Sequence, residues 1–241
     1  MINFINDPVY LKMCERLKRR KIDNLYQDPY HRYSRILQYL HRKNLISEGV
    51  SCLDLGCLRP ELASLLINNY NADVTGIDQW DMKASWPEIK MNFIQTDLAG
   101  DFTAYIPKEF DIVFALEVLE HMIDTDLFLE RIKKSVKKGG IVAISTPNIN
   151  NLRNRIMVPL GGYPVSMEYK NIIHHVRLYN VKALKSHLEE HGFEVLDIYG
   201  VNFLPYKGLM SNRIYRKISE WLAVKLPALC SNMIAIVKLP K

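Results

Sequence analysis

The chain has 241 residues, 48% of them hydrophobic and 24% charged, which is enough for one α/β domain with a full core. It has no apolar run near the ~18–20 residues that span a bilayer, and its N-terminus lacks the apolar core of a signal peptide. Its four cysteines are scattered, with neither zinc-ligand nor disulfide-framework spacing, which favours a cytoplasmic protein with reduced thiols.

Charge is unevenly distributed along the chain. Residues 1–49 carry ten Lys and Arg against five Asp and Glu, and residues 200–241 carry seven against one. The middle is therefore acidic, although the formal net charge is +6. Basic ends indicate either contact with an anionic partner, such as a phosphorylated substrate, a membrane surface or RNA, or solvated helix faces.

Short apolar runs alternate with helical periodicity through most of the chain. Two basic amphipathic helices are predicted first, at 8–21 and 29–43. The predicted strands then lie at 50–55, 72–77, 91–95, 110–116, 140–145, 193–199 and 233–239, and the later helices at 61–69, 126–136, 181–190 and 211–225. Continuous apolar strands that alternate with helices favour a parallel sheet covered on both faces. We therefore predict a Rossmann-like, doubly wound α/β fold with a seven-stranded, mostly parallel sheet.

The same pattern predicts the organisation of the domain. We expect an N-terminal helical cap at 1–48 and one domain at 49–241, with a lid at 148–180 and a C-terminal helix–strand unit at 205–241. A turn at 138–140 is expected before the fifth strand. The apolar side of helix 211–225 (Met210, Ile214, Ile218, Trp221 and Leu222) is expected to dock on the core. The alternative is an interfacial helix on an anionic membrane.

The ends of the first strands carry the residues suited to binding a ligand. The first strand ends in Asp54-Leu55-Gly56-Cys57, where a glycine allows a sharp turn and close approach of a ligand. The second ends in Gly76-Ile77-Asp78, and a carboxylate at that place can accept both hydroxyls of a ribose. Gln95-Thr96-Asp97-Leu98 follows the third strand, and the fourth lies within 110–121. Carboxyl ends of parallel strands meet at one sheet edge, which predicts a binding crevice there.

In this order the motifs resemble those of the class I S-adenosylmethionine-dependent methyltransferases. The resemblance covers residues 50–195 and is to the small-molecule group that includes ubiquinone-biosynthesis, sugar and natural-product methyltransferases. It implies that the chain binds S-adenosylmethionine and releases S-adenosylhomocysteine. The residues that it assigns to the cofactor are Asp54, Gly56 and Cys57 at the methionine part, Asp78 and Gln79 at the ribose, Asp97 and Leu98 at the adenine, and Glu117 below the sulfonium.

The glycine loop departs from the family pattern at two positions. Leu58 and Pro60 stand where the family has glycines. Pro60 suits the first turn of a helix, whereas the Cβ of Leu58 would lie where backbone approaches the cofactor. We expect cofactor binding to be retained, because Asp54, Gly56, Asp78 and Asp97 are all present.

A second cluster follows the fourth strand. If that segment is helical, Glu117, Glu120 and His121 share one face. His121, aided by Glu120 and His175, is predicted to remove a proton from the acceptor. The alternatives are a divalent cation held by the cluster together with His174 or His175, and a purely structural role. No metal ligand is assigned. The other histidines, His31, His41, His187 and His191, are expected to be solvated.

The predicted function is methyl transfer to a hydroxyl of a small molecule such as a sugar, natural product, quinone or lipid-linked intermediate. An anionic or lipid-linked acceptor and peripheral membrane contact would fit the basic ends, and no nucleic-acid partner is expected. Three alternatives stay open: RNA 2′-O-methylation with metal assistance, a non-catalytic scaffold of the same fold, and different chemistry on that fold.

Overall fold

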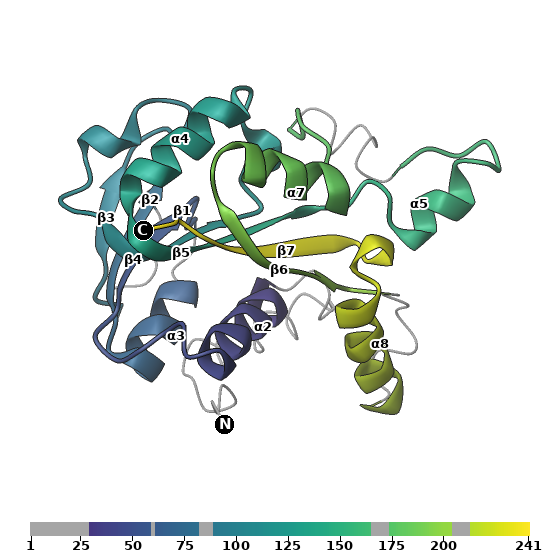
Figure 1. Cartoon of the computed structure of the whole chain (residues 1–241), viewed down its shortest axis with the longest axis horizontal. Coiled ribbons are helices and arrows are strands. Elements are labelled where there is room, and N and C mark those ends of the chain that lie inside the picture. The colour runs from purple at the N-terminus through teal and green to yellow at the C-terminus, as the bar shows by residue number, and fades with distance from the viewer. Residues whose placement is uncertain (1–28, 59–60, 82–88, 165–173, 204–212) are drawn as a thin grey trace.

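The structure is a computed structural model that describes residues 29–58, 61–81, 89–164, 174–203 and 213–241 (Figure 1). Its centre is one seven-stranded sheet in the order β3-β2-β1-β4-β5-β7-β6. The strands are β1 (Ser51–Leu55), β2 (Asp73–Asp78), β3 (Asn92–Gln95), β4 (Phe110–Leu116), β5 (Val136–Pro147), β6 (Glu194–Val201) and β7 (Asn232–Lys238). β7 runs antiparallel to both β5 and β6, and the other pairs are parallel. The predicted doubly wound α/β fold is confirmed.

Helices cover both faces of the sheet. α2 (Pro29–Arg42), α3 (Glu61–Tyr70) and α8 (Arg213–Lys225) lie on one face, and α4 (Thr125–Ser135) and α7 (Val181–Glu190) lie on the other (Figure 1). The shorter elements are α5 (Leu152–Met157) and the 3₁₀ turns η4 (Phe102–Ala104), η5 (Leu119–His121) and η7 (Pro227–Leu229). None of the helices among the described residues is long and apolar enough to cross a membrane.

Burial explains why the central strands read as continuous apolar runs. Every residue of β1 is buried, because helices pack against both of its faces. One apolar cluster joins the sheet to α2 and α3, and a second joins it to α4 and α7. Ile36, Leu37 and Leu40 of α2 belong to the first cluster. The predicted helix at 8–21 lies outside the described residues, and the division into cap and domain stays a prediction.

The predicted turn at 138–140 is wrong. β5 continues through it, from Val136 opposite Phe110 to Ile141 opposite Ile112. Gly139, with a φ of 78°, absorbs the extra residues in a left-handed conformation that suits glycine.

The expectation that the apolar side of α8 docks on the core holds for Leu222, which packs against the buried Phe203, Ala223 and Cys230, but it is wrong for the other described members of that side. Ile214, Ile218 and Trp221 are 70%, 52% and 62% exposed. The helix instead packs through Ser219 and Ala223, which are buried. The reason is close backbone approach: a Cβ on Gly200 of β6 would lie 2.9 Å from the Ala223 carbonyl oxygen. Small residues, rather than the most hydrophobic ones, therefore select the docking face.

Candidate functional site

The site lies where the winding of the sheet reverses. β1 pairs with β2 on one side and with β4 on the other, so their carboxyl ends meet at one edge of the sheet, where open α/β sheets bind ligands in a crevice. Asp54, Asp78 and Glu117 come from the ends of these three strands. The predicted edge is therefore the edge on which these side chains meet.

The loop after β1 requires glycine at its first position. Gly56 has a φ of 72°, and a Cβ there would lie 2.6 Å from Cγ2 of Val118. The amides of Gly56 and Cys57 donate to the Ile77 carbonyl oxygen at 2.8 and 3.2 Å. The turn is thus fixed to the end of β2.

Leu58 holds the backbone shape for which the family uses glycine. Its φ is 32°, within the left-handed region that side chains disfavour. Its amide donates to Oδ2 of Asp78 at 2.7 Å, and its side chain is exposed. Arg59 and Pro60 lie outside the described residues.

Asp78 organises the end of β2. Its side chain is buried, with Oδ1 accepting the Trp80 amide at 2.9 Å and Oδ2 accepting that of Leu58. Each carboxylate oxygen has a second lone pair, so two hydroxyls can still be accepted. The neighbouring Gln79 is exposed, and its main-chain carbonyl accepts a hydrogen bond from Nε2 of Gln95 at 3.1 Å.

Asp54 is a buried carboxyl without a hydrogen bond from any residue in the described part of the chain. Burial, followed by the charges of Asp78 and Glu61, raises its pKa to about 8. A cationic group placed beside it would restore its ionised form. This arrangement fits the ammonium group of a bound amino acid such as the methionine part of the expected cofactor.

The remaining residues assigned to the cofactor lie at or after the ends of β1 and β3 and differ in burial. Leu98 is buried and lies 3.8 Å from where a Cβ of Gly56 would be. Cys57 is buried, and burial raises the pKa of its thiol. Asp97 is exposed, and its Oδ1 accepts the Ala99 amide at 2.9 Å in a turn after β3.

Glu117 is held by three other elements. Its Oε1 accepts the Ser145 hydroxyl at 2.8 Å and pairs with Arg32 at 3.2 Å, while Oε2 accepts Nδ2 of Asn232 at 2.8 Å. Its φ of 57° turns the chain sharply after β4. Sequence analysis missed Arg32, Ser145 and Asn232, because they come from α2, β5 and β7 and share no local motif with Glu117.

The predicted helical face of Glu117, Glu120 and His121 is not present. The segment is one 3₁₀ turn at Leu119–His121, and the left-handed Glu117 directs its own side chain elsewhere. His175 takes its place: a ligating atom from each of Glu120, His121 and His175 lies within 4.8 Å of the others.

Glu120 is a buried carboxyl at the base of this cluster. Burial and then the charge of Glu117 raise its pKa well above the ordinary value, which favours its protonated form. Its oxygens make no well-oriented hydrogen bond among the described residues, although the Thr146 hydroxyl lies beside them. Its main-chain carbonyl accepts the amides of Val176 and Arg177 at 2.8 and 3.1 Å, which anchors the segment carrying His175.

The hydrogen bond of His121 defines the tautomer of its neutral ring. Nδ1 lies 2.8 Å from the His174 carbonyl oxygen, which can only accept, so Nδ1 carries the proton. Nε2 of the exposed ring then has a free lone pair. The His175 ring lies 5.0 Å away between centroids, and burial, followed by the charge of His121, lowers its pKa. The lowered pKa favours the neutral form of the His175 ring.

A second histidine cluster corrects the sequence prediction. His187 and His191 were expected to be solvated, but their side chains are only 14% and 15% exposed. Nε2 of His187 lies 2.8 Å from Oδ1 of Asp126, and its Nδ1 lies 3.0 Å from the Tyr179 hydroxyl. These contacts link α7 to α4. His41 is exposed, as predicted.

Comparisons with known proteins agree on one family. Residues 19–198 match the family model described as a methyltransferase domain. A ubiquinone biosynthesis O-methyltransferase of Brucella anthropi is 24% identical over 187 residues, which is 75% of each chain. An S-adenosylmethionine-dependent methyltransferase of Archaeoglobus fulgidus has a similar structure, with a TM-score of 0.55, 19% identity and coverage of 86% of this chain and 94% of that one. The cyclase SpnF also has this fold, with a TM-score of 0.58, 18% identity and coverage of 86% and 80%.

Proposed function

Because the chain belongs to the class I S-adenosylmethionine-dependent methyltransferases, we propose that it methylates a hydroxyl oxygen of a small molecule, with His121 as the general base. The observation that carries this proposal is the His121 tautomer: Nδ1–H is held by the His174 carbonyl, and Nε2 is left to accept a proton. A hydroxyl must lose its proton as the oxygen attacks carbon, so a positioned neutral imidazole suits an oxygen acceptor.

The described residues fit the cofactor at both ends of the crevice. We assign Asp54 to its ammonium group, because this buried carboxyl has a raised pKa and no described residue donates a hydrogen bond to it. Asp78 is assigned to the ribose hydroxyls, with Gln79 beside it; Gly56 and Cys57 line the methionine part, and Leu98 and Asp97 border the adenine. The bound cofactor supplies an electrophilic methyl group on its sulfonium.

Glu117, His175 and Glu120 are assigned supporting roles. Glu117 is held in place by Arg32, Ser145 and Asn232, and we assign it to the wall below the sulfonium position. His175 packs against His121 and fixes its ring. The main-chain carbonyl of Glu120 holds the segment carrying His175, and its buried carboxyl, with a raised pKa, lies at the base of the cluster. Positioning and exclusion of water are the main contributions expected of such a site.

The name of the Brucella anthropi relative, a ubiquinone biosynthesis O-methyltransferase, supports an oxygen acceptor. We propose an acceptor in the range of a quinone, sugar, natural product or lipid-linked intermediate. The acidic middle of the chain and the absence of a recognisable RNA-binding module do not favour a nucleic acid.

Two measurements test the proposal. S-adenosylhomocysteine should bind the wild type in calorimetry, and Asp78→Ala should abolish that binding. Methyl transfer from labelled cofactor to a panel of catechols and hydroxylated sugars should then be compared in wild type and His121→Asn. The expected loss of kcat is about 10²- to 10⁴-fold, with the Kd of S-adenosylhomocysteine unchanged.

His41→Asn is the matched control, because His41 is exposed on α2 outside the crevice. An unchanged kcat in His121→Asn would show that His121 is not the general base. Methylation of amines alone in a parallel panel would replace the oxygen acceptor with a nitrogen one.

A further inference from the structure

We propose that α8, together with the cavity between α2 and α8, forms a docking face for the surface of an anionic phospholipid bilayer. This inference is independent of the methyl acceptor. It rests on an exposed row of apolar side chains, on the cations around that row, and on a cavity that adjoins it.

The apolar row runs along the outer side of α8. Ile214, Ile218 and Trp221 recur at spacings of four and three, which places them on one helix face. Val224 extends the row on the same helix, with 47% exposure, and Leu226, directly after the helix, is 41% exposed. Exposed large apolar side chains gathered on one helix are a mark of an interaction surface.

Cations lie within this row rather than opposite it. Lys217 and Lys225 are both exposed and share the helix side of Ile218 and Trp221. Long lysine stems can lie along apolar surface while their ammonium groups reach headgroups. The single acidic residue of α8, Glu220, lies toward β6, where it borders Gly200 and Val201.

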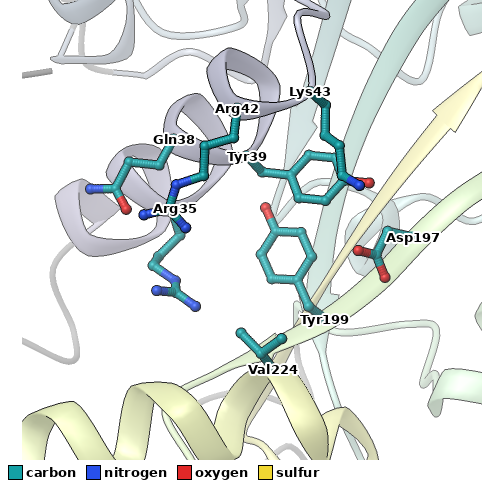
Figure 2. Close-up of a pocket in the computed structure, with 8 residues that line it drawn as sticks. All are labelled: Arg35, Gln38, Tyr39, Arg42, Lys43, Asp197, Tyr199 and Val224. Atoms are coloured by element: carbon teal, nitrogen blue, oxygen red, sulfur yellow. The ribbon is translucent and has the colours of Figure 1, made fainter. Parts of the chain in front are cut away.

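A cavity of about 220 Å³ lies beside the row, between α2, β6 and α8 (Figure 2). Its lining residues are Arg35, Gln38, Tyr39, Arg42, Lys43, Asp197, Tyr199 and Val224. This is several times the ~30 Å³ share of one water, so a headgroup phosphate can enter.

The cavity carries an excess of positive charge. It contains three cationic side chains and one carboxylate, and none of the three cations forms an ion pair within the described part of the chain. The carboxylate, Asp197, lies beside Tyr39, whose pKa is raised first by burial and then by the Asp197 charge. Tyr39 stacks on Tyr199 at 5.5 Å and forms an aromatic wall, as Figure 2 shows.

Val224 makes the two parts one face, because it lines the cavity and also continues the apolar row. α8 has 13 residues, about 20 Å of helix, so it would lie in the interface plane. An apolar row entering the acyl boundary, with five cations at headgroup level, matches an anionic bilayer in both apolarity and charge.

The test is co-sedimentation of the full chain with vesicles of phosphatidylcholine, alone or with 30% phosphatidylglycerol. The chain should bind the anionic vesicles and not the neutral ones. Ile218→Ser/Trp221→Ser and Arg42→Glu/Lys43→Glu should each reduce the partition coefficient at least tenfold. Leu127→Ser, which changes an exposed leucine on α4 across the sheet, is the matched control and should bind as wild type does.

Trp221 gives a direct readout that does not depend on sedimentation. The chain has three tryptophans, so Trp80→Phe/Trp86→Phe leaves Trp221 as the only one. Its emission should shift to the blue with anionic vesicles, and 10 mM inorganic phosphate alone should produce no shift. A shift with phosphate alone would indicate a free-anion site and overturn the bilayer proposal. Equal binding by Ile218→Ser/Trp221→Ser would also overturn it. The proposal would also fail if the wild type forms a dimer in solution and does not bind vesicles, and if Ile218→Ser/Trp221→Ser abolishes that dimer.

Discussion

At the scale of single residues, Leu58 shows a side chain in conflict with its backbone. The turn after β1 requires a left-handed residue there, and the Leu58 amide donates to Asp78. A non-glycine residue in that conformation costs about 1–2 kcal/mol. The Asp78 carboxylate and the Ile77 carbonyl together hold the loop in place despite this cost.

Replacing Leu58 with glycine should therefore raise the free energy of unfolding by about 0.5–1 kcal/mol, after the entropy cost of glycine is subtracted. It should also lower the Kd of S-adenosylhomocysteine, because the Cβ leaves the crevice. Urea unfolding and calorimetry measure the two effects. Asn71→Gly, at a φ of 48°, is the control: asparagine tolerates this region, so the stability gain should be smaller and the Kd unchanged. If the Leu58→Gly variant is less stable than wild type, the backbone of Leu58 is not strained.

At the scale of elements, one carboxylate joins three strands at the edge opposite the site. Asp111 of β4 accepts the amide and hydroxyl of Ser51 of β1 at 3.0 and 2.5 Å, and Nζ of Lys137 of β5 at 2.7 Å. Burial alone would raise its pKa. The hydrogen bonds from Lys137 and Ser51 outweigh burial and lower the pKa to about 2.

This lowered pKa predicts how stability depends on pH. Since the folded pKa of about 2 lies below the ordinary 3.8, the ionised Asp111 stabilises the fold above about pH 4. That contribution is lost as pH falls from about 4 toward 2. Asp111→Asn should accordingly be less stable than wild type at pH 7, and the difference in urea midpoint should narrow by pH 3.

Asp73→Asn is the control for this comparison, because the Asp73–Lys108 pair is nearly half exposed on both sides and exposed pairs contribute little. Its urea midpoint should follow that of wild type at each pH. If the difference in urea midpoint between Asp111→Asn and wild type stays constant from pH 7 to pH 3, the carboxylate charge is not the cause of the lost stability.

At the scale of the whole molecule, α2 packs a fully buried apolar face on the core of the domain. Ile36, Leu37 and Leu40 are fully buried against the sheet and α3. Arg32 of the same helix reaches Glu117 at the other end of the crevice wall. The helix and the sheet should therefore unfold together.

Leu37→Ala tests this cooperativity. Removal of a fully buried leucine should cost about 2–5 kcal/mol. Urea transitions followed by circular dichroism and by tryptophan fluorescence should shift together and remain coincident. Gln38→Ala, on the neighbouring partly exposed position, should change stability by less than about 0.5 kcal/mol. Separate transitions would instead identify α2 as an independent cap.

The local sequence pattern predicted those helices and strands whose formation depends on neighbouring residues. β4 at Phe110–Leu116 and α7 at Val181–Glu190 match their predicted bounds, because apolar runs and helix periodicity are contiguous in sequence. The partners of the site were not predictable in this way. Asn232 contacts Glu117 from 115 residues away, and the His174 carbonyl reaches His121 across 53. The side of α8 that docks is set by the room that Gly200 leaves for close packing, and hydrophobicity alone does not predict it.

Arg32 and Arg35 stand one turn apart on α2, one at the crevice and the other in the cavity beside α8. A rigid helix cannot shift at one of these positions and stay fixed at the other. If occupancy of either place shifts α2, the two occupancies are linked, and linkage is reciprocal. Whatever factor a bound cofactor applies to the affinity for a lipid surface, that surface applies to the affinity for cofactor. The affinity of the enzyme for its methyl donor would then differ between the membrane-bound and the free protein.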